Sequence, residues 1–530
     1  MQGPAIRIAK ELGLFTVVAD ASPAAPCVPM ADRFERIDLK DKEGIDALAR
    51  SLQKSGGLAG IMTAGTDFSA TVAWAAEKLG LPGIPYEAAL NASDKARMRS
   101  CFKKAGLPSP EFTAITESEM QDKPPLPFPL VVKPVDNMGG RGCCRVNILE
   151  EYREAVMEAI RFSRSGRAIV EAFMDGPEFS VDAIVYHGEI TICGLADRHI
   201  FFPPYFIEMG HTMPTTVAPE QQEALLETFC AGVRALGLAG ETSVGAAKGD
   251  IKLTRSGPMI GEIAARLSGG YMSGWTYPYS SGAEPIRAAI LGAVGRKPDC
   301  LVPLKTWTSA ERAFISIPGT VKEISGIDAA RNRPFVKDLF LRAACGGKAD
   351  FPRNNVSKCG NIISAAPDRA SAVEAAESAA RSILIRLDPC DPETEKFLSN
   401  AGADFPPDAY PLGPELKKAL AALPDTKLQG QGEDLQIVPF PAFQASGLKD
   451  YAGRSVAETL EVVRELSGLT LPEFQAENAE KKPESSDNNK NNILGRPFWS
   501  AIARGGYQGA VYYVEQLGIR NEELGMEEER

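Results

Sequence analysis

The stretch from Gly245 to Gly270 constrains the fold of this chain more than any other segment. It predicts two strands joined by a tight turn, because side chains of alternating character flank an Arg-Ser-Gly-Pro sequence. Asp250 lies on the first strand and Glu262 on the second, and strand parity can bring both carboxylates to one face. Two such carboxylates repel each other unless a cation or a proton lies between them. Together with Arg266, they predict a site for a magnesium ion that carries a phosphate group, and an ordinary surface hairpin is the alternative.

Length and composition narrow the class of protein. The chain has 530 residues, enough for three or four domains of roughly 100–200 residues each. Its net charge of −11 argues against nucleic acid or an anionic membrane as the main partner. The ten cysteines include no CxxC pair, which favours reduced thiols and a cytoplasmic location. Three dispersed histidines are too few for a histidine-based metal centre.

The first 90 residues alternate between helix and strand patterns. Strands are predicted at residues 15–20 and 58–63, with helices between and after them. This alternation is typical of a parallel sheet with helices on its faces. Asp20 at a strand end could indicate a dinucleotide fold, but no G-x-G-x-x-G sequence precedes it. The chain opens on a helix, so we expect the sheet to lack its first strand.

A lysine and a glycine-rich loop follow an apolar strand near the middle of the chain. The strand covers residues 128–134 and carries Lys133, and the loop contains Gly139, Gly140 and Gly142. Glycine-rich turns let backbone N–H groups approach phosphate oxygens, and a lysine adds positive charge. A hairpin loop also contains glycines for steric reasons alone, so this feature needs support from others.

Residues 197–215 form a connection rich in proline and aromatic residues. It is unusually apolar for a loop, which indicates a lid or a substrate wall and not a plain linker. Asp197 and His211 within it could orient an amine substrate, although His211 could equally be a histidine that packs the loop.

These features resemble the ATP-grasp superfamily, and the resemblance covers about residues 1–390. They occur in the order that the family shows. Asp94-Lys95 precedes a Gly-Leu-Pro-x-Pro sequence, the lysine strand and glycine loop follow, and a strand at residues 170–174 leads to Glu178 before the hairpin with Arg266. Each match alone is weak, and the shared order is what carries the resemblance.

The resemblance implies a fold class and a division of the chain. We expect an α/β (α+β) protein with an ATP-grasp fold. Its expected parts are an N-terminal parallel-sheet domain (1–90), a central ATP-grasp domain (91–300, with about 125–190 covering the phosphates), a small C-terminal α+β domain (301–390) and an accessory tail (391–530). Within the tail, residues 475–492 predict disorder and residues 498–517 a terminal helix. Because the tail lies outside the resemblance, we expect it to be dispensable for ATP turnover.

The resemblance also implies roles for individual residues. The expected ATP-binding residues are Lys95, Lys133, Gly139, Gly140, Gly142, Glu171, Phe173 and Glu178. The metal ligands would be Asp250 and Glu262, and Arg266 would act in catalysis. The substrate candidates are Asp197, His211, Ser268 and Gly269. The implied cofactors are ATP and Mg²⁺ (or Mn²⁺).

Within the superfamily, the sequence is most similar to the L-amino-acid ligase branch. The similarity lies in the N-terminal domain and in the segments FPPYFIEMGHTMPT and ERAFISIPGTVKEI. Members of this branch join a carboxylate to an amine through an acyl phosphate and release ADP and phosphate. The implied partners are a small carboxylate, expected to be an amino acid, and a small amine, with no nucleic acid or membrane. A homodimer is the candidate assembly.

Two alternatives stay open. An enzyme similar to biotin carboxylase or carbamoyl-phosphate synthase would use carboxyphosphate, although the tail has no Ala-Met-Lys-Met biotinyl motif and the unit is not duplicated. The second alternative is a regulatory protein that binds ATP without catalysis. Ala264 favours it slightly, because the family commonly has an asparagine metal ligand at that position.

Overall fold

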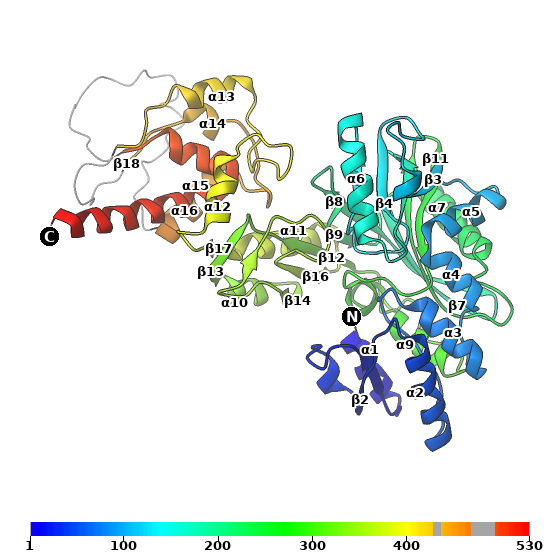
Figure 1. Ribbon diagram of the computed structural model, residues 1–530. Helices are drawn as coiled ribbons and strands as arrows, with labels where there is room; N and C mark the ends of the chain where they lie inside the picture. The colour runs from blue at the N-terminus through cyan, green and yellow to red at the C-terminus, as the bar shows by residue number, and fades with distance from the viewer. Residues whose placement is uncertain (1, 428–435, 468–492, 529–530) are drawn as a thin grey trace.

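The computed structural model describes residues 2–427, 436–467 and 493–528, and Figure 1 shows how they are arranged. In the N-terminal part, β1 (Val17–Asp20) pairs in parallel with β2 (Arg33–Arg36), so a small parallel sheet forms as expected, but its second strand lies where none was predicted. The helices of this part are α1 (Gln2–Glu11), η1 (Val28–Met30), α2 (Lys42–Ser55), α3 (Ser69–Leu79) and α4 (Tyr86–Ser93).

The prediction of a strand at residues 58–63 was wrong, because these residues belong to no sheet. Apolar side chains of α1, β1 and this segment line a cavity of about 350 Å³ instead. The segment therefore does not pair with β1, because strands must lie roughly 5 Å apart to exchange backbone hydrogen bonds.

A four-stranded antiparallel sheet forms one wall of the central region. Its strands are arranged in the order β3-β6-β4-β5, and α6 (Leu149–Phe162) packs on it, so that Val156 shares an apolar core with Leu130 and Val132. The helix α5 (Lys95–Lys104) precedes this sheet and begins at Asp94, whose carboxylate accepts a hydrogen bond from the Arg97 amide at 3.0 Å. The strands are β3 (Phe112–Thr116), β4 (Leu130–Pro134), β5 (Cys144–Val146) and β6 (Arg167–Ala172), and the short turn η2 (Glu117–Glu119) follows β3.

An eight-stranded antiparallel sheet forms the other wall. Its order is β11-β10-β7-β8-β9-β12-β16-β14, and α7 (Pro219–Ala235) buries Phe229 against Ile260 and Ile263 on one face. The strands are β7 (Glu178–Tyr186), β8 (Glu189–Phe201), β9 (Ile207–Met213), β10 (Val244–Thr254), β11 (Gly257–Ala264), β12 (Thr308–Phe314), β14 (Val336–Leu341) and β16 (Gly360–Ala366). The helices between β11 and β12 are η3 (Met272–Thr276), α8 (Tyr277–Ser281) and α9 (Pro285–Ala293).

The region after residue 301 does not have a sheet entirely of its own. Three of its strands, β12, β14 and β16, continue the central sheet through the pairing of β12 with β9. Its remaining strands form a small separate sheet beside α11. These elements are β13 (Gly319–Ser325), α10 (Ile327–Arg331), β15 (Lys348–Ala349), α11 (Arg369–Ser382) and β17 (Leu384–Leu387).

The tail packs into this region instead of standing apart from it. The Tyr507 hydroxyl accepts a hydrogen bond from the Ile385 amide at 2.8 Å, and the Gln508 side chain accepts one from the Ile317 amide at 3.2 Å. All four of these residues are buried, so deletion of the tail would expose apolar surface and leave amides unpaired. The tail elements are α12 (Pro392–Ser399), α13 (Pro414–Ala421), β18 (Gln436–Ile437), α14 (Pro441–Gln444), α15 (Val456–Ser467), β19 (Ile493–Leu494) and α16 (Arg496–Glu528).

Two expectations about the tail have different outcomes. The terminal helix predicted at residues 498–517 forms within α16, which breaks at Gly506. The segment 475–492, predicted to be disordered, lies outside the described residues. Among the helices that the structure describes, none combines the length and the apolar character needed to cross a bilayer.

Candidate active site

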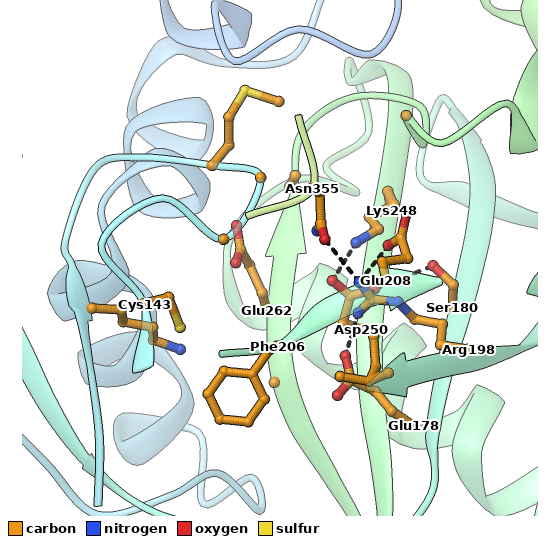
Figure 2. A pocket seen from close by; sticks show the side chains of 18 of the residues that line it. Cys143, Glu178, Ser180, Arg198, Phe206, Glu208, Lys248, Asp250, Glu262 and Asn355 are labelled. Atoms are coloured by element: carbon orange, nitrogen blue, oxygen red, sulfur yellow. Dashed lines mark hydrogen bonds and ion pairs between the residues drawn. The ribbon is translucent and has the colours of Figure 1, made fainter. Parts of the chain in front are cut away.

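A cavity of about 300 Å³ lies between the two sheets and collects most of the predicted site residues. Both sheets and the loop after β11 contribute to its walls. Predicted residues that line it are Lys95, Lys133, Gly139, Gly140, Glu171, Glu178, His211, Asp250, Glu262, Arg266, Ser268 and Gly269. Figure 2 shows part of this lining, with Glu262 on one side of the cavity and a cluster around Arg198 on the other.

The predicted hairpin forms from β10 and β11 and places its two carboxylates as expected. Asp250 pairs directly with Glu262 in the antiparallel register, so the two side chains extend from the same face. The register shifts next to this pair, where Gly261 forms a bulge. A Cβ atom on Gly261 would lie 2.9 Å from the Asp250 carbonyl oxygen, which explains why glycine occupies the position.

Lysines supply the positive charge that the two carboxylates require. Lys95 Nζ lies 3.7 Å from a Glu262 carboxylate oxygen and donates a hydrogen bond to the Asn137 carbonyl at 2.8 Å. Burial opposes ionisation of Glu262, but the charges of Lys95, Lys248 and Lys133 lower the pKa of its carboxyl group to about 2. Glu262 is therefore ionised at neutral pH, and its side chain is 31% exposed, toward the cavity.

Asp250 lies in a cluster of charges that the sequence did not predict. Its carboxylate contacts Lys248 and lies 2.9 Å from Arg198. Arg198 also contacts Glu178 and lies 2.6 Å from Glu208, as Figure 2 shows. Lys248 could have been found from its spacing, because residues two apart on a strand share a face with each other.

The donor set fits a divalent cation that is bound together with phosphate. Magnesium is commonly held by one or two carboxylates and completed by phosphate oxygens and water, which suits Glu262 and Asp250. Among the described residues no group of three or more acidic, histidine or cysteine side chains could hold a metal by itself. Ala264 lines the cavity and supplies no side-chain oxygen. A cation here would therefore depend on the nucleotide for most of its ligands.

The glycine loop closes one side of the cavity. Gly139 and Gly140 have positive φ angles of 69° and 75°, which favour glycine, and both line the cavity. The Asn355 amide donates to the Gly139 carbonyl at 2.9 Å and so joins the loop to the C-terminal region. Gly142 does not line the cavity; a Cβ atom there would lie 2.9 Å from the Phe162 ring. Its role is to let Phe162 pack closely.

The strand predicted at residues 170–174, which the resemblance likens to the adenine hinge of the family, contains a buried ion-pair network. Glu171 lies 2.7 Å from Lys133 and 2.8 Å from Arg99. Burial opposes its ionisation, but these two cations lower the pKa of Glu171 to about 2. Arg99, which is 1% exposed, also donates to the carbonyls of Ile260 and Gly261 at 3.0 and 2.6 Å. Its signal in the sequence was its position four residues after Lys95, on the same helix face.

The structure does not place Phe173 in the cavity. Its neighbours Ala172 and Met174 line the cavity, whereas the Phe173 ring lies under the Arg145 guanidinium at 4.2 Å and near Lys252 at 5.4 Å. Strand alternation explains the difference, because adjacent side chains point to opposite faces. The Phe173 side chain thus lies outside the cavity, and the expected role of Phe173 in ATP binding stays a prediction.

Asp197 is also outside the cavity. Its carboxylate contacts Arg369 and accepts a hydrogen bond from the Thr215 hydroxyl. The next residue on β8, Arg198, lines the cavity in its place. The one-residue alternation of the strand thus places the Asp197 side chain outside the cavity, and its role in substrate binding stays a prediction.

His211 is buried in the cavity wall and carries a positive charge at neutral pH. Its Nδ1 atom lies 2.6 Å from a Glu311 carboxylate oxygen, and its Nε2 atom lies 3.5 Å from Glu208. Burial opposes the charge, but the carboxylates of Glu208 and Glu311 raise the pKa of His211 to about 9. A buried imidazolium donates hydrogen bonds and cannot act as a general base at neutral pH.

A buried carboxylate holds the loop that follows Arg266. Asp182 accepts hydrogen bonds from the Ser268 amide at 3.2 Å and from the Ser273 hydroxyl at 2.7 Å. Burial raises the pKa of Asp182, and the two serines partly offset this effect. Arg266 donates to the Leu267 carbonyl at 3.0 Å, while its buried Nε atom has no partner among the described residues. The loop is thus fixed in place, and Arg266 belongs to the lining of the cavity.

The charge on His211 predicts a specific response to pH. Because its pKa is raised on folding, its contribution to stability is complete below its ordinary value of 6.5 and is lost as pH rises through about 9. We expect a histidine-selective NMR titration to show one imidazole with a pKa near 9 that disappears in His211→Gln. His199 provides an internal control, since burial and Arg312 lower its pKa to about 3. A His211 resonance that titrates at the ordinary value would contradict the buried imidazolium.

Comparison with known proteins places this geometry in a family. Residues 126–273 match the ATP-grasp domain, residues 6–83 the ATP-grasp N-terminal domain, and residues 313–388 the L-amino acid ligase C-terminal domain 2. The chain belongs to the ATP-grasp superfamily. This confirms the expected fold and the expected class of enzyme, an ATP-grasp ligase that forms carbon–nitrogen bonds.

Individual relatives resemble different lengths of the chain. The uncharacterized protein y4rH of Sinorhizobium fredii is 27% identical over 394 residues, which is 72% of this chain and 80% of that protein. A D-alanine–D-alanine ligase of Granulibacter bethesdensis is 32% identical over 169 residues, which is 30% of this chain and 54% of that enzyme. The chain thus matches about half the length of that ligase. The solved L-amino acid ligase of Bacillus licheniformis has a TM-score of 0.62 at 24% identity and covers 73% of this chain and 96% of its own.

Proposed function

We propose that this protein is an ATP-dependent ligase that joins the carboxylate of an amino acid to an amine through an acyl phosphate. The observation that carries this proposal is the pair Asp250 and Glu262, side by side on one hairpin and facing a cavity lined with cations. The cations that line the cavity are Lys95, Lys133, Arg141, Arg198, Lys248, Lys252 and Arg266. Such a balance of charge suits a triphosphate bound with a divalent cation.

The first step would activate the carboxylate. A carboxylate oxygen of the substrate attacks the γ-phosphorus of ATP, the bond from that phosphorus to the bridging oxygen breaks, and ADP leaves. Lys95, Lys133 and the N–H groups of the glycine loop would hold the phosphates. Mg²⁺ held by Glu262 and Asp250 would neutralise charge on the transferred group. The guanidinium of Arg266, which lines the cavity, would contact that group during transfer.

The second step would form the amide. The neutral amine attacks the acyl carbon, phosphate leaves, and the ammonium proton passes to solvent or phosphate. Water would compete with the amine as nucleophile. The glycine loop, which Asn355 holds over the cavity, supports this chemistry because it would limit the access of water to the acyl phosphate. The imidazolium of His211, in the cavity wall, would hold Glu208 and Glu311 in place, because each of its ring nitrogens lies beside one of these carboxylates.

A screen for ADP release tests the proposal. The protein is incubated with ATP, Mg²⁺ and pairs of amino acids, and products are identified by mass. We expect at least one pair to release ADP and yield a product lighter by one water than its two components combined. A parallel reaction with bicarbonate and free biotin tests the carboxyphosphate alternative. ATP binding with no ADP release in any reaction would support the non-catalytic alternative and contradict the proposal.

Replacement of Lys133 by alanine is expected to weaken ATP binding and to leave the protein folded. A charged hydrogen bond of this kind contributes about 1.5–3 kcal/mol, which corresponds to a Kd roughly 10–100 times higher. The fold should persist because Glu171 keeps its contact with Arg99. Calorimetric titration with ATP measures the effect, with the exposed Lys123→Ala as the matched control. Equal ATP affinity in the Lys133 and Lys123 variants would remove Lys133 from the nucleotide site.

A further inference from the structure

A second cavity, of about 400 Å³, lies on the opposite face of the central sheet from the active site. The strands themselves separate the two spaces. On β8, Arg198 lines the active-site cavity and His199 the second one, and on β9 the same is true of Glu208 and Met209. The outer wall comes from α11 and from the tail, including residues 450–454 and 505–508. The tail therefore completes a space that the rest of the chain leaves open.

One side of this cavity carries charges of both signs. Arg312 lies 3.1 Å from Glu377, and Arg381 lies one helical turn further along α11 from Glu377. Glu377 is 40% exposed, and the side chain of Arg381, which is 29% exposed, makes a long contact of 3.4 Å with Glu374, its one ion pair among the described residues. The other charged pair of the lining, Asp450 with Arg454, is buried and satisfied by its own contacts. Glu377 and Arg381 are thus available to a ligand.

The other side of the cavity is apolar and aromatic. Phe202, Phe314, Tyr451 and Tyr507 line it, and the hydroxyl groups of both tyrosines are already bonded to the backbone. A cavity of this size, mostly apolar with a few convergent polar groups, is typical of a site for a small molecule. An acid and a base side by side select a molecule that carries both an ammonium and a carboxylate group.

We propose that this second cavity binds a free amino acid with an apolar side chain. Its carboxylate would contact Arg381 and Arg312, its ammonium group Glu377, and its side chain the aromatic wall. Binding at this cavity does not depend on the proposed ligase reaction.

Arg312 connects the second cavity to the active site, so the ligand is expected to act as an effector. Its Nη1 atom donates to the carbonyls of His211 and Glu311 at 3.1 and 2.9 Å and to the Thr212 hydroxyl at 3.2 Å. A ligand that draws Arg312 toward its carboxylate would change the hydrogen bonds that hold His211 in the active-site wall. The coupling rests on the proposed function, because His211 is a substrate-binding candidate there.

Calorimetric titration of the full-length protein with L-phenylalanine and with L-leucine tests the binding. We expect saturable binding that becomes about ten-fold weaker in Arg381→Ala and in Glu377→Gln, through loss of one charged contact. Phenethylamine and phenylacetate, which each lack one charged group, should bind more weakly than phenylalanine. Arg331→Ala, an exposed arginine of α10 paired with Asp328, serves as the control for loss of a surface charge.

Two results would overturn the proposal. One is the absence of saturable binding of either amino acid to the wild-type protein. The other is equal binding by wild type, Arg381→Ala and Glu377→Gln, because the amino acid would then occupy the active site. Glu262→Gln in the active site should leave binding at the second cavity unchanged. Failure of the ligase proposal would appear separately, as absence of ADP release in a protein whose amino-acid binding is still weakened by Arg381→Ala.

Discussion

Replacement of Glu262 by glutamine is expected to lower the rate of ATP-dependent product formation by about 10²–10³, which is the usual cost of removing one electrostatic contact to a transition state. The carboxylate is ionised, faces the cavity and lies beside Asp250. Glutamine keeps the shape but removes the charge that would attract the magnesium ion. The thermal shift that Mg²⁺ and ADP produce together should shrink for the same reason.

Steady-state ADP release and thermal unfolding with and without Mg²⁺-ADP measure these two effects. Glu241→Gln, an exposed residue before β10, is the matched control. Asp250→Asn should give a milder loss, since Lys248 and Arg198 remain close to that position. Wild-type turnover in both Glu262→Gln and Asp250→Asn would place the metal site elsewhere in the molecule.

Replacement of Arg99 by methionine is expected to destabilise the protein by about 3–5 kcal/mol, as is usual when one partner of a buried ion pair is removed. The change leaves Lys133 as the remaining ion-pair partner of Glu171 and leaves the carbonyls of Ile260 and Gly261 without the hydrogen bonds that Arg99 donates. Calorimetric unfolding of the nucleotide-free protein should show an earlier first transition. ATP binding should weaken as well, because Arg99 holds the hinge strand and the carboxylate hairpin together.

Arg97→Met is the matched control for this change. Arg97 lies on the same helix, but its side chain is 43% exposed and pairs with Glu87 at the surface. Surface ion pairs of this kind contribute only about 0–1 kcal/mol. An equal loss of stability in the two variants would mean that helix propensity, and not the buried network, accounts for the effect.

The hairpin could be predicted from the sequence because its signals are local. Alternation and a turn sequence specify β10 and β11, and parity alone then places Asp250 opposite Glu262. The face of β8 on which Asp197 lies could not be predicted in this way, and Arg198 lines the cavity in its place. A strand predicted without its register leaves the inward face undetermined, and β7 and β8 pair with an irregularity between Asp182 and Ala183.

The residues that neutralise the site could not be predicted as a group. Arg198 and Arg99 meet Asp250 and Glu171 across 52 and 72 positions of the chain, respectively, and no local pattern encodes such contacts. The repulsion expected between the paired carboxylates is relieved by nearby cations before any metal binds: Arg198 and Lys248 at Asp250, and Lys95, Lys248 and Lys133 at Glu262. The docking of the tail on Ile385 and Ile317 was missed for the same reason, since it depends on contacts over more than 100 positions.

The extension of the central sheet by β12, β14 and β16 has a mechanical consequence. Backbone hydrogen bonds between neighbouring strands resist shear. The carboxylate hairpin and the strands β12, β14 and β16 should therefore move together as one rigid body. The four-stranded sheet shares no strand with the central sheet and can rotate relative to it. Rotation of the smaller sheet away from the cavity would break the bond between the Asn355 amide and the Gly139 carbonyl, and it would also strain the contacts by which Arg99 joins the two sheets.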